Sequence, residues 1–254
     1  MSTAFLGRGL VIVGIVAGLL AVSLPFADGA RYVDDGTAAA FLIVLLAFTS
    51  LLPAEAGRDL VAAAAGSAAF GFFLFIPAVF AFDSLGRLEA GAWLGVSTAL
   101  IPIGCLLVFA AGGGAAPAPA IDRGPGLLVG TVGLVLVAVG IWLDIGSDGP
   151  TYWGASSSGH AVGIVLIVLV VVDAVLIAAA AHSSMQTGDL ALLAAAVTFG
   201  YATFVVVGAA FDDFASLGPG GWIEACGGVL LLGGVVLARF SRSRSPAPAA
   251  VSAG

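Results

Sequence analysis

Long apolar stretches that are nearly free of charge dominate the chain. About 20 such residues suffice for an α-helix to cross the hydrocarbon core of a bilayer. The second of these stretches is short for a complete span, and the first would also allow a removable signal peptide. We predict an all-α integral membrane protein with eight transmembrane helices. The stretches are residues 9–26, 37–53, 59–82, 90–111, 126–145, 160–181, 189–211 and 220–240.

The composition excludes several classes of protein. Of the 254 residues, 9% are charged and 61% are apolar, whereas a soluble domain carries about 25% charged residues. The net charge is −7, and no basic stripe is present that could neutralise phosphates. We therefore expect no nucleic-acid partner. The lipid bilayer is the partner that this composition predicts.

The arginines predict the orientation in the membrane. Every basic residue is Arg, which indicates a GC-rich coding bias and favours a prokaryotic cell (inner) membrane as the location. Arg and Lys are enriched in cytoplasmic loops. With eight spans, six Arg lie on one side and two on the other, so we expect both termini in the cytoplasm. The first side holds Arg8, Arg58, Arg123, Arg239, Arg242 and Arg244, and the second holds Arg31 and Arg87.

Two segments of the chain resemble each other. Residues 70–93 align with residues 199–222 without a gap, and nine of the 24 positions are identical. A composition of this kind would give about two or three identities by chance. Likeness of composition is the alternative to a duplication. The paired Asp83/Asp212 and Trp93/Trp222 favour the duplication.

The duplication predicts how the chain is divided. Residues 1–111 and 125–240 would form two tandem four-helix repeats. The repeats would be parallel, because four helices bring both halves into the membrane in the same sense. Residues 112–124 are expected to be a Gly/Ala/Pro linker, and residues 241–254 a disordered cytoplasmic tail.

One predicted helical hairpin carries a further likeness. The Phe-Gly-Phe sequence that starts at Phe70, the apolar run after it and Trp93 resemble one hairpin of the urea/amide channel family. That family has six helices. The resemblance covers these 24 residues and carries no residue role over to this chain.

Asp173 is the one ionisable residue deep inside a predicted span. Helix rise places it about 20 Å in from His160, near the bilayer midplane. A carboxyl group there costs about 2.5–3.5 kcal/mol and requires a partner, a water-filled cavity or a bound proton. The functional interpretation is a proton relay or a solute ligand. The alternatives are a protonated acid that joins two helices and a misplaced span boundary.

Other acids are predicted near helix ends. Glu224 would lie in the first turn of the last helix, where a negative charge is favoured. Capping is the first interpretation for Glu224, and membership with Asp173 in a proton or solute site is the second. Asp59 and Asp189 each follow a Gly or an Arg at a helix start and are predicted N-caps.

No signature of enzyme chemistry is found in the sequence. A nucleotide-binding loop, a metal-ligand cluster and a Ser/His/Asp set are all missing, so we expect no enzyme, no cofactor and no metal. The leading hypothesis is a small-solute or proton-linked transporter or channel. The alternative is a non-transporting membrane scaffold or an accessory subunit of a larger membrane complex. A homo-oligomer and a membrane-protein partner are both left open.

Overall fold

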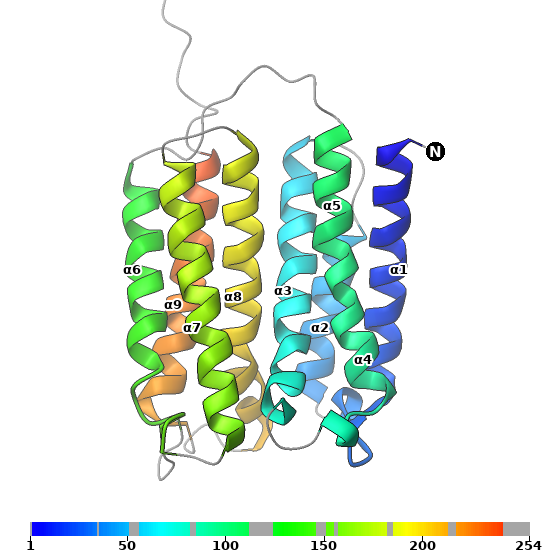
Figure 1. The fold of residues 1–254 in the computed structure, drawn as a ribbon, viewed down its shortest axis with the longest axis vertical. Helices are drawn as coiled ribbons and strands as arrows, with labels where there is room; N and C mark the ends of the chain where they lie inside the picture. Colours follow the sequence, from blue (N-terminus) through cyan, green and yellow to red (C-terminus); the bar gives the residue numbers. More distant parts are fainter. Residues whose placement is uncertain are drawn as a thin grey trace, which may run out of the picture.

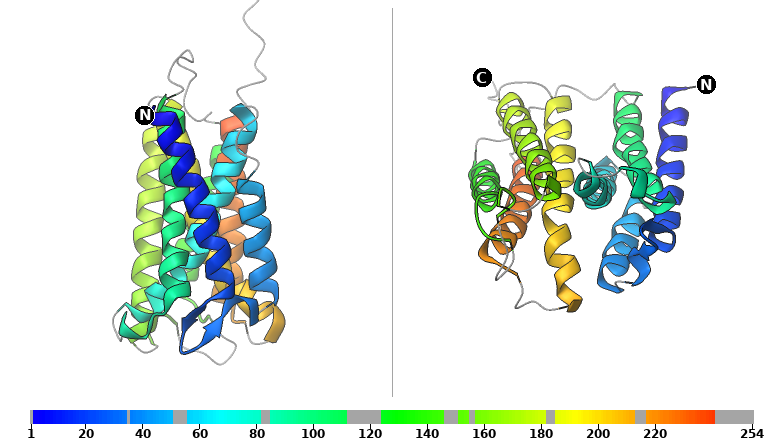
Figure 2. Two further views of the ribbon diagram at one scale, coloured as in Figure 1. Left: turned by 90° about the vertical axis from the view of Figure 1, so that its right-hand side faces the viewer. Right: turned by 60° about the horizontal axis from the view of Figure 1, so that its bottom comes forward.

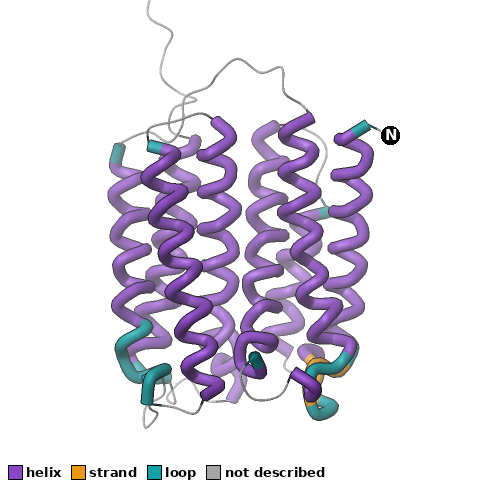
Figure 3. Tube along the Cα trace, viewed as in Figure 1, coloured by secondary structure: helices purple, strands orange, loops and turns teal. Residues whose placement is uncertain are grey.

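The computed structural model describes most of the chain, and the description is nearly all helical (Figure 3). The predicted linker, apart from Gly124, and the predicted tail lie outside the described residues. The described residues are 2–34, 36–50, 56–81, 85–111, 124–145, 151–154, 157–181, 185–212 and 217–240.

The helices stand side by side in a bundle (Figure 1). Helix α4 continues through a single 3₁₀ turn, Ser97–Ala99, into α5, so the two form one rod. The helices are α1 (Thr3–Ser23), α2 (Gly36–Thr49), α3 (Ala56–Phe80), α4 (Ala90–Val96), α5 (Leu100–Ala111), α6 (Pro125–Gly140), α7 (Ser157–Ala180), α8 (Met185–Asp212) and α9 (Pro219–Phe240). Two further 3₁₀ turns are Tyr32–Asp34 and Leu85–Arg87.

Within the described residues, six helical rods are long and apolar enough to cross a membrane, which fits a mostly helical, multi-pass membrane protein. Each contains 21 or 22 residues of spanning character. Helices α2 and α6 are shorter, with 14 and 16 residues. A helix of that length measures about 21–24 Å, against a hydrocarbon core of about 30 Å. The six rods are α1, α3, α4–α5, α7, α8 and α9.

Helix α6 ends five residues before the predicted boundary at residue 145. Its chain tightens after Gly140, where the Trp142 N–H donates to the Val139 carbonyl and the Leu143 N–H donates to the Gly140 carbonyl. Such i→i+3 bonds satisfy the last carbonyls of a helix while they turn the chain away from its axis. Hydropathy alone does not detect this ending, because the residues that follow are still apolar.

A small β-hairpin follows α1 where the sequence predicted that the first span would continue to residue 26. Strand β1 (Pro25–Ala27) pairs with the antiparallel strand β2 (Ala30–Arg31). Asp28 and Gly29 both have positive φ, 51° and 82°, as a type I′ turn requires. The end of the bundle that carries this hairpin is called the hairpin end below.

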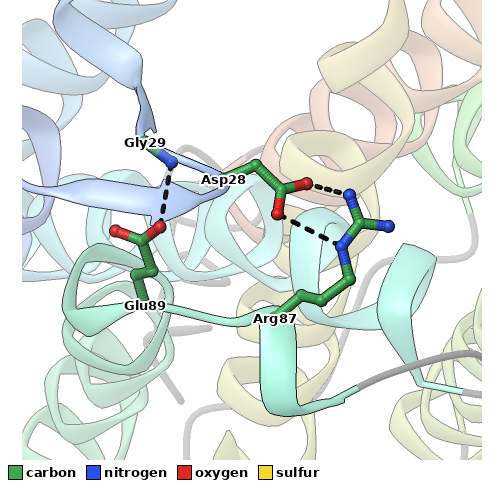
Figure 4. A network of polar contacts seen from close by, with 4 residues as sticks. All are labelled: Asp28, Gly29, Arg87 and Glu89. Carbon is green, nitrogen blue, oxygen red and sulfur yellow. Dashed lines mark hydrogen bonds and ion pairs between the residues drawn. The ribbon is translucent and has the colours of Figure 1, made fainter.

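Polar contacts hold the hairpin to the connection between α3 and α4 (Figure 4). Asp28 and Arg87 form an ion pair, and the Gly29 N–H donates to Oε1 of Glu89 at 2.9 Å. The Glu89 N–H in turn donates to the Phe26 carbonyl at 2.9 Å. The ion-paired side chains are 54% and 56% exposed, so water screens their attraction.

Helices pair in a regular pattern within the bundle. Helix α1 packs on α5 and α6 on α9, while α2 packs on α3 and α7 on α8. Helices α3 and α8 lie side by side in the middle of the bundle (Figures 1 and 2). Across that middle, α2 also contacts α8, and α7 also contacts α3.

Glycines let the two central helices touch through their backbones. A Cβ atom on Gly71 of α3 would overlap the carbonyl of Val197, and a Cβ on Gly200 of α8 would overlap the carbonyl of Ala68. Membrane helices associate through such close packing of small residues, because lipid tails are as apolar as the side chains.

Apolar side chains cover the outside of the bundle as well as its interior. Ile12, Leu128 and Val175, on three different helices, are 61%, 67% and 61% exposed. In water, an apolar surface of this extent would aggregate. A bilayer solvates it, which agrees with a multi-pass membrane protein.

The glycine contact between α3 and α8 yields a prediction about stability. Gly200→Ala should lower the free energy of unfolding by about 1–3 kcal/mol, because the added methyl group overlaps the Ala68 carbonyl. Gly233→Ala on α9 is the control, since a Cβ there meets no atom within 4 Å. The control should leave stability unchanged or raise it by up to about 1 kcal/mol. Unfolding in mixed micelles measures both, and equal losses would contradict the prediction.

Candidate functional site

Asp173 lies in a buried contact between α7 and α8. It has no exposed surface, and the hydroxyl group of Thr198 on α8 donates to its Oδ2 at 2.6 Å. Its Oδ1 is buried without a hydrogen-bond partner among the described residues. The structure therefore gives this carboxyl one hydrogen-bonded oxygen and one unpaired oxygen.

The sequence of α8 explains how Asp173 becomes buried. The neighbouring turn of α8 carries small side chains, and Ala195 and Ala196 are fully buried. Small residues allow α7 to approach α8 closely, and the Asp173 carboxyl is enclosed between the two helices. Asp173 lies seven residues before the end of α7 at Ala180, which is about 10 Å from the end opposite the hairpin.

Glu224 is a second fully buried acid, and the prediction that it caps α9 near the headgroups is wrong. It is the sixth residue of α9 and has no exposed surface. Its Oε2 accepts a hydrogen bond from the Tyr152 hydroxyl at 2.9 Å, whereas its Oε1 is buried and unpaired within the described chain. The missing side chain of Gly140 makes room for it, since a Cβ there would overlap the Cγ of Glu224.

Two tyrosines surround Glu224. Tyr152 lies in the connection between α6 and α7 and is 3% exposed. Burial, the nearby Glu224 carboxylate and the hydrogen bond to it raise the pKa of Tyr152 well above its usual range. Tyr152 therefore keeps its proton and donates it in the hydrogen bond. Tyr201 on α8 is 1% exposed, lies in the same buried cluster as Tyr152 and donates to the Val162 carbonyl at 3.1 Å.

The structure does not bring Asp173 and Glu224 into one site. Glu224 lies five residues after the start of α9 at the hairpin end, which is a depth of about 8 Å. Asp173 lies toward the opposite end of the bundle. Two residues of α8 lie near these acids. Thr198 contacts Asp173, and Tyr201 shares a buried cluster with Tyr152. They are three residues apart and therefore lie on the same face of α8.

The two predicted N-caps are corrected by the helix boundaries. Helix α8 begins at Met185, so Asp189 is its fifth residue, and Asp189 pairs with Arg239 of α9 at 3.1 Å. Helix α3 begins at Ala56, so Asp59 is its fourth residue; the side chain of Asp59 lies outside what the structure describes. The sequence signal failed because both helices start before their apolar runs.

Histidine and cysteine residues form no metal site in the described part of the chain. A ring nitrogen of His160 lies 2.9 Å from the Trp153 carbonyl, and the two rings stack. His182 lies outside the described residues. Cys105 is buried and Cys226 is exposed, and neither forms a disulfide.

Sequence reasoning identified the buried acids but missed their partners. Thr198, Tyr152 and Tyr201 were not singled out, nor was the pairing of Arg239 with Asp189. The three-residue spacing of Thr198 and Tyr201 inside an apolar helix is a signal that could have found two of them. Tyr152 carries no such signal, because its place depends on how a connecting segment folds.

Comparisons with protein families, with curated proteins and with solved structures find no match to this chain.

The hydrogen bond from Thr198 yields a second prediction. Thr198→Ala should lower the free energy of unfolding by about 0.6–1.7 kcal/mol, the range of interhelical hydrogen bonds in membranes. The loss arises because both oxygens of Asp173 would then be unpaired. Thr203→Ala is the control, since the Thr203 hydroxyl donates to carbonyls of its own helix. Equal effects of the two variants in mixed micelles would refute an interhelical contribution.

The two ion pairs yield a third prediction. A double-mutant cycle on Asp189 and Arg239, whose side chains are both 11% exposed, should give a coupling of about 1 kcal/mol. The same cycle on the exposed pair Asp28 and Arg87 should give less, and added salt should weaken it further. A larger coupling for the exposed pair would show that burial does not control these interactions.

Proposed function

We propose that the chain is a proton-linked membrane transporter or channel in which Asp173 binds and releases the transported proton. The observation that carries this proposal is the unpaired, buried Oδ1 of Asp173. An acid inside a membrane helix is costly and typically marks an ion or proton pathway.

The surroundings of Asp173 favour a proton over a larger ligand. Thr198 is the one hydrogen-bond partner that the described structure gives the carboxyl. Metal ions require about four to eight ligands, and a polar solute needs several hydrogen-bonding groups. A proton needs a single free oxygen, and Oδ1 offers one.

We further propose that α2 and α6 complete eight spans. Both stand parallel to the six longer rods (Figure 1). The bilayer can thin locally around a short helix at modest cost. With eight spans, the arginine distribution favours both termini in the cytoplasm of a prokaryotic cell.

The contact between α3 and α8 supports two parallel repeats. At an offset of 129 residues, Gly71 corresponds to Gly200 and Ala68 corresponds to Val197. Gly71 meets Val197, and Gly200 meets Ala68, so the offset converts each of the two contacts into the other. Reciprocal contacts of this kind characterise an interface around a two-fold axis. The exchange of α2 and α7 across the middle of the bundle agrees with the same axis.

The proposal yields a prediction for flux through the protein. Asp173→Asn should abolish proton flux into proteoliposomes under an imposed pH gradient, because an amide cannot carry the proton. Asn keeps the size of the side chain and can still accept from Thr198. Thr49→Val is the control, since Thr49 is also fully buried and its hydroxyl group donates to the Leu45 carbonyl of its own helix.

The outcomes separate the proposal from its alternative. Flux through the wild type and the Thr49→Val control, without flux through Asp173→Asn, supports a relay at Asp173. Unchanged flux through Asp173→Asn would remove Asp173 from the pathway. A wild type that does not conduct, together with a membrane protein that co-purifies in fixed ratio, would favour a scaffold or accessory subunit.

A further inference from the structure

We propose that Glu224 and Tyr152 form a second proton-binding site, at the hairpin end of the bundle, which exchanges protons with Asp173 along α8. The proposal rests on the proton transfer assigned above to Asp173 and extends it to a second group.

The first argument is the state of the Glu224 carboxyl. Both oxygens are buried, and one hydrogen bond, from Tyr152, is all that the described structure supplies. An ionised carboxylate buried with an oxygen lacking a donor is strongly disfavoured. A bound proton removes the charge, and the hydrogen bond from Tyr152 remains available to the protonated group.

The second argument is the electrostatic setting of Glu224. Its side chain lies against Gly140, the last residue of α6. The carbonyl end of a helix carries a partial negative charge and disfavours a second negative charge beside it. No Arg or His is hydrogen-bonded or ion-paired to Glu224 among the described residues. Proton binding therefore relieves repulsion as well as desolvation.

The third argument is the polar face of α8. Thr198 contacts Asp173, while Tyr201, one turn nearer the hairpin end, lies in the same buried cluster as Tyr152, the partner of Glu224. Hydroxyl groups can accept one proton while they donate another. The proposed transfer would use these two hydroxyl groups, which lie three residues apart on one face of α8.

The fourth argument is that the first half of the chain lacks this arrangement. At the same offset of 129 residues, Glu224, Tyr201 and Thr198 correspond to Gly95, Phe72 and Ala69. Phe73 packs against Gly95, with a ring carbon 2.7 Å from where a Cβ would stand. The counterpart of Phe73 in the second half is Ala202. In the second half, Ala202 therefore stands where the first half has the Phe73 ring, and Glu224 stands where the first half has Gly95.

The test combines proton flux with infrared spectroscopy of the carboxyl groups in proteoliposomes. Wild type, Asp173→Asn and Glu224→Gln are compared, and Glu89→Gln is the control. Glu89 lies at the same end of the bundle, outside the spans, and accepts from Gly29. Glu224→Gln should reduce flux to the leak of protein-free liposomes and remove one component of the protonated-carboxyl C=O band. The Glu89→Gln control should do neither.

A second variant guards against misfolding of Glu224→Gln. Tyr152→Phe keeps the acid and the ring and removes one hydroxyl. The C=O component assigned to Glu224 should then move to higher frequency, because the carboxyl loses its hydrogen bond. A purely structural role of Tyr152 would not move that component. An unmoved component would therefore overturn the pairing of Glu224 with Tyr152 as a proton site.

The outcomes distinguish this proposal from the proposed function. If Asp173→Asn abolishes flux and Glu224→Gln conducts like wild type, the second site is overturned and the role of Asp173 stands. If the wild type does not conduct, both the proposed function and the proton transfer between the two acids are overturned. The infrared band then decides about proton binding alone: a component lost in Glu224→Gln supports it, and its absence overturns it.

Discussion

The backbone contact between α3 and α8 is the interaction on which the rest of the bundle depends. Lipid gives membrane helices no hydrophobic reason to associate, so close packing has to supply the attraction. Gly71 and Gly200 remove the side chains that would keep the two helices apart. The contact brings α8 to the middle of the molecule, where it meets α2, α3, α7 and α9. Because α8 is surrounded by these helices, its side chains Thr198 and Tyr201 are buried.

The sequence predicted the fold class well, but it predicted the ends of the helices poorly. Apolar stretches located every described helix, because the bilayer demands about 20 apolar residues for each span. Boundaries depend on local hydrogen bonds, which hydropathy does not report. Helix α6 therefore ends early, α8 starts early, and the Asp28–Gly29 turn lies where a continuing helix was expected. The Asp-Gly pair was a readable turn signal.

In the candidate site, too, the sequence predicted one part and missed another. Asp173 could be found from the sequence because a lone acid in an apolar helix is costly wherever the helix packs. Its partner could not, since Thr198 becomes a partner through the contact of α7 with α8. Glu224 was placed near headgroups because it lies close to a helix start. Instead it is fully buried, with Tyr152 hydrogen-bonded to it and Gly140 packed against its side chain.

The two halves of the bundle fill their interiors with different kinds of side chain. The two halves of the chain pack through the glycine contacts of α3 and α8, and three aromatic residues fill the interior of the first half: Tyr32, Phe72 and Phe73. Burial raises the pKa of Tyr32 well above its usual range, so its hydroxyl stays neutral there. Among the described residues, the buried acids all lie in the second half. The second half carries the acids and the hydroxyl groups between them, each of which is uncharged when protonated. Under the function proposed above, a proton would move between these groups while the net charge within the bilayer changes by at most one unit, which keeps the cost of charge inside the membrane low.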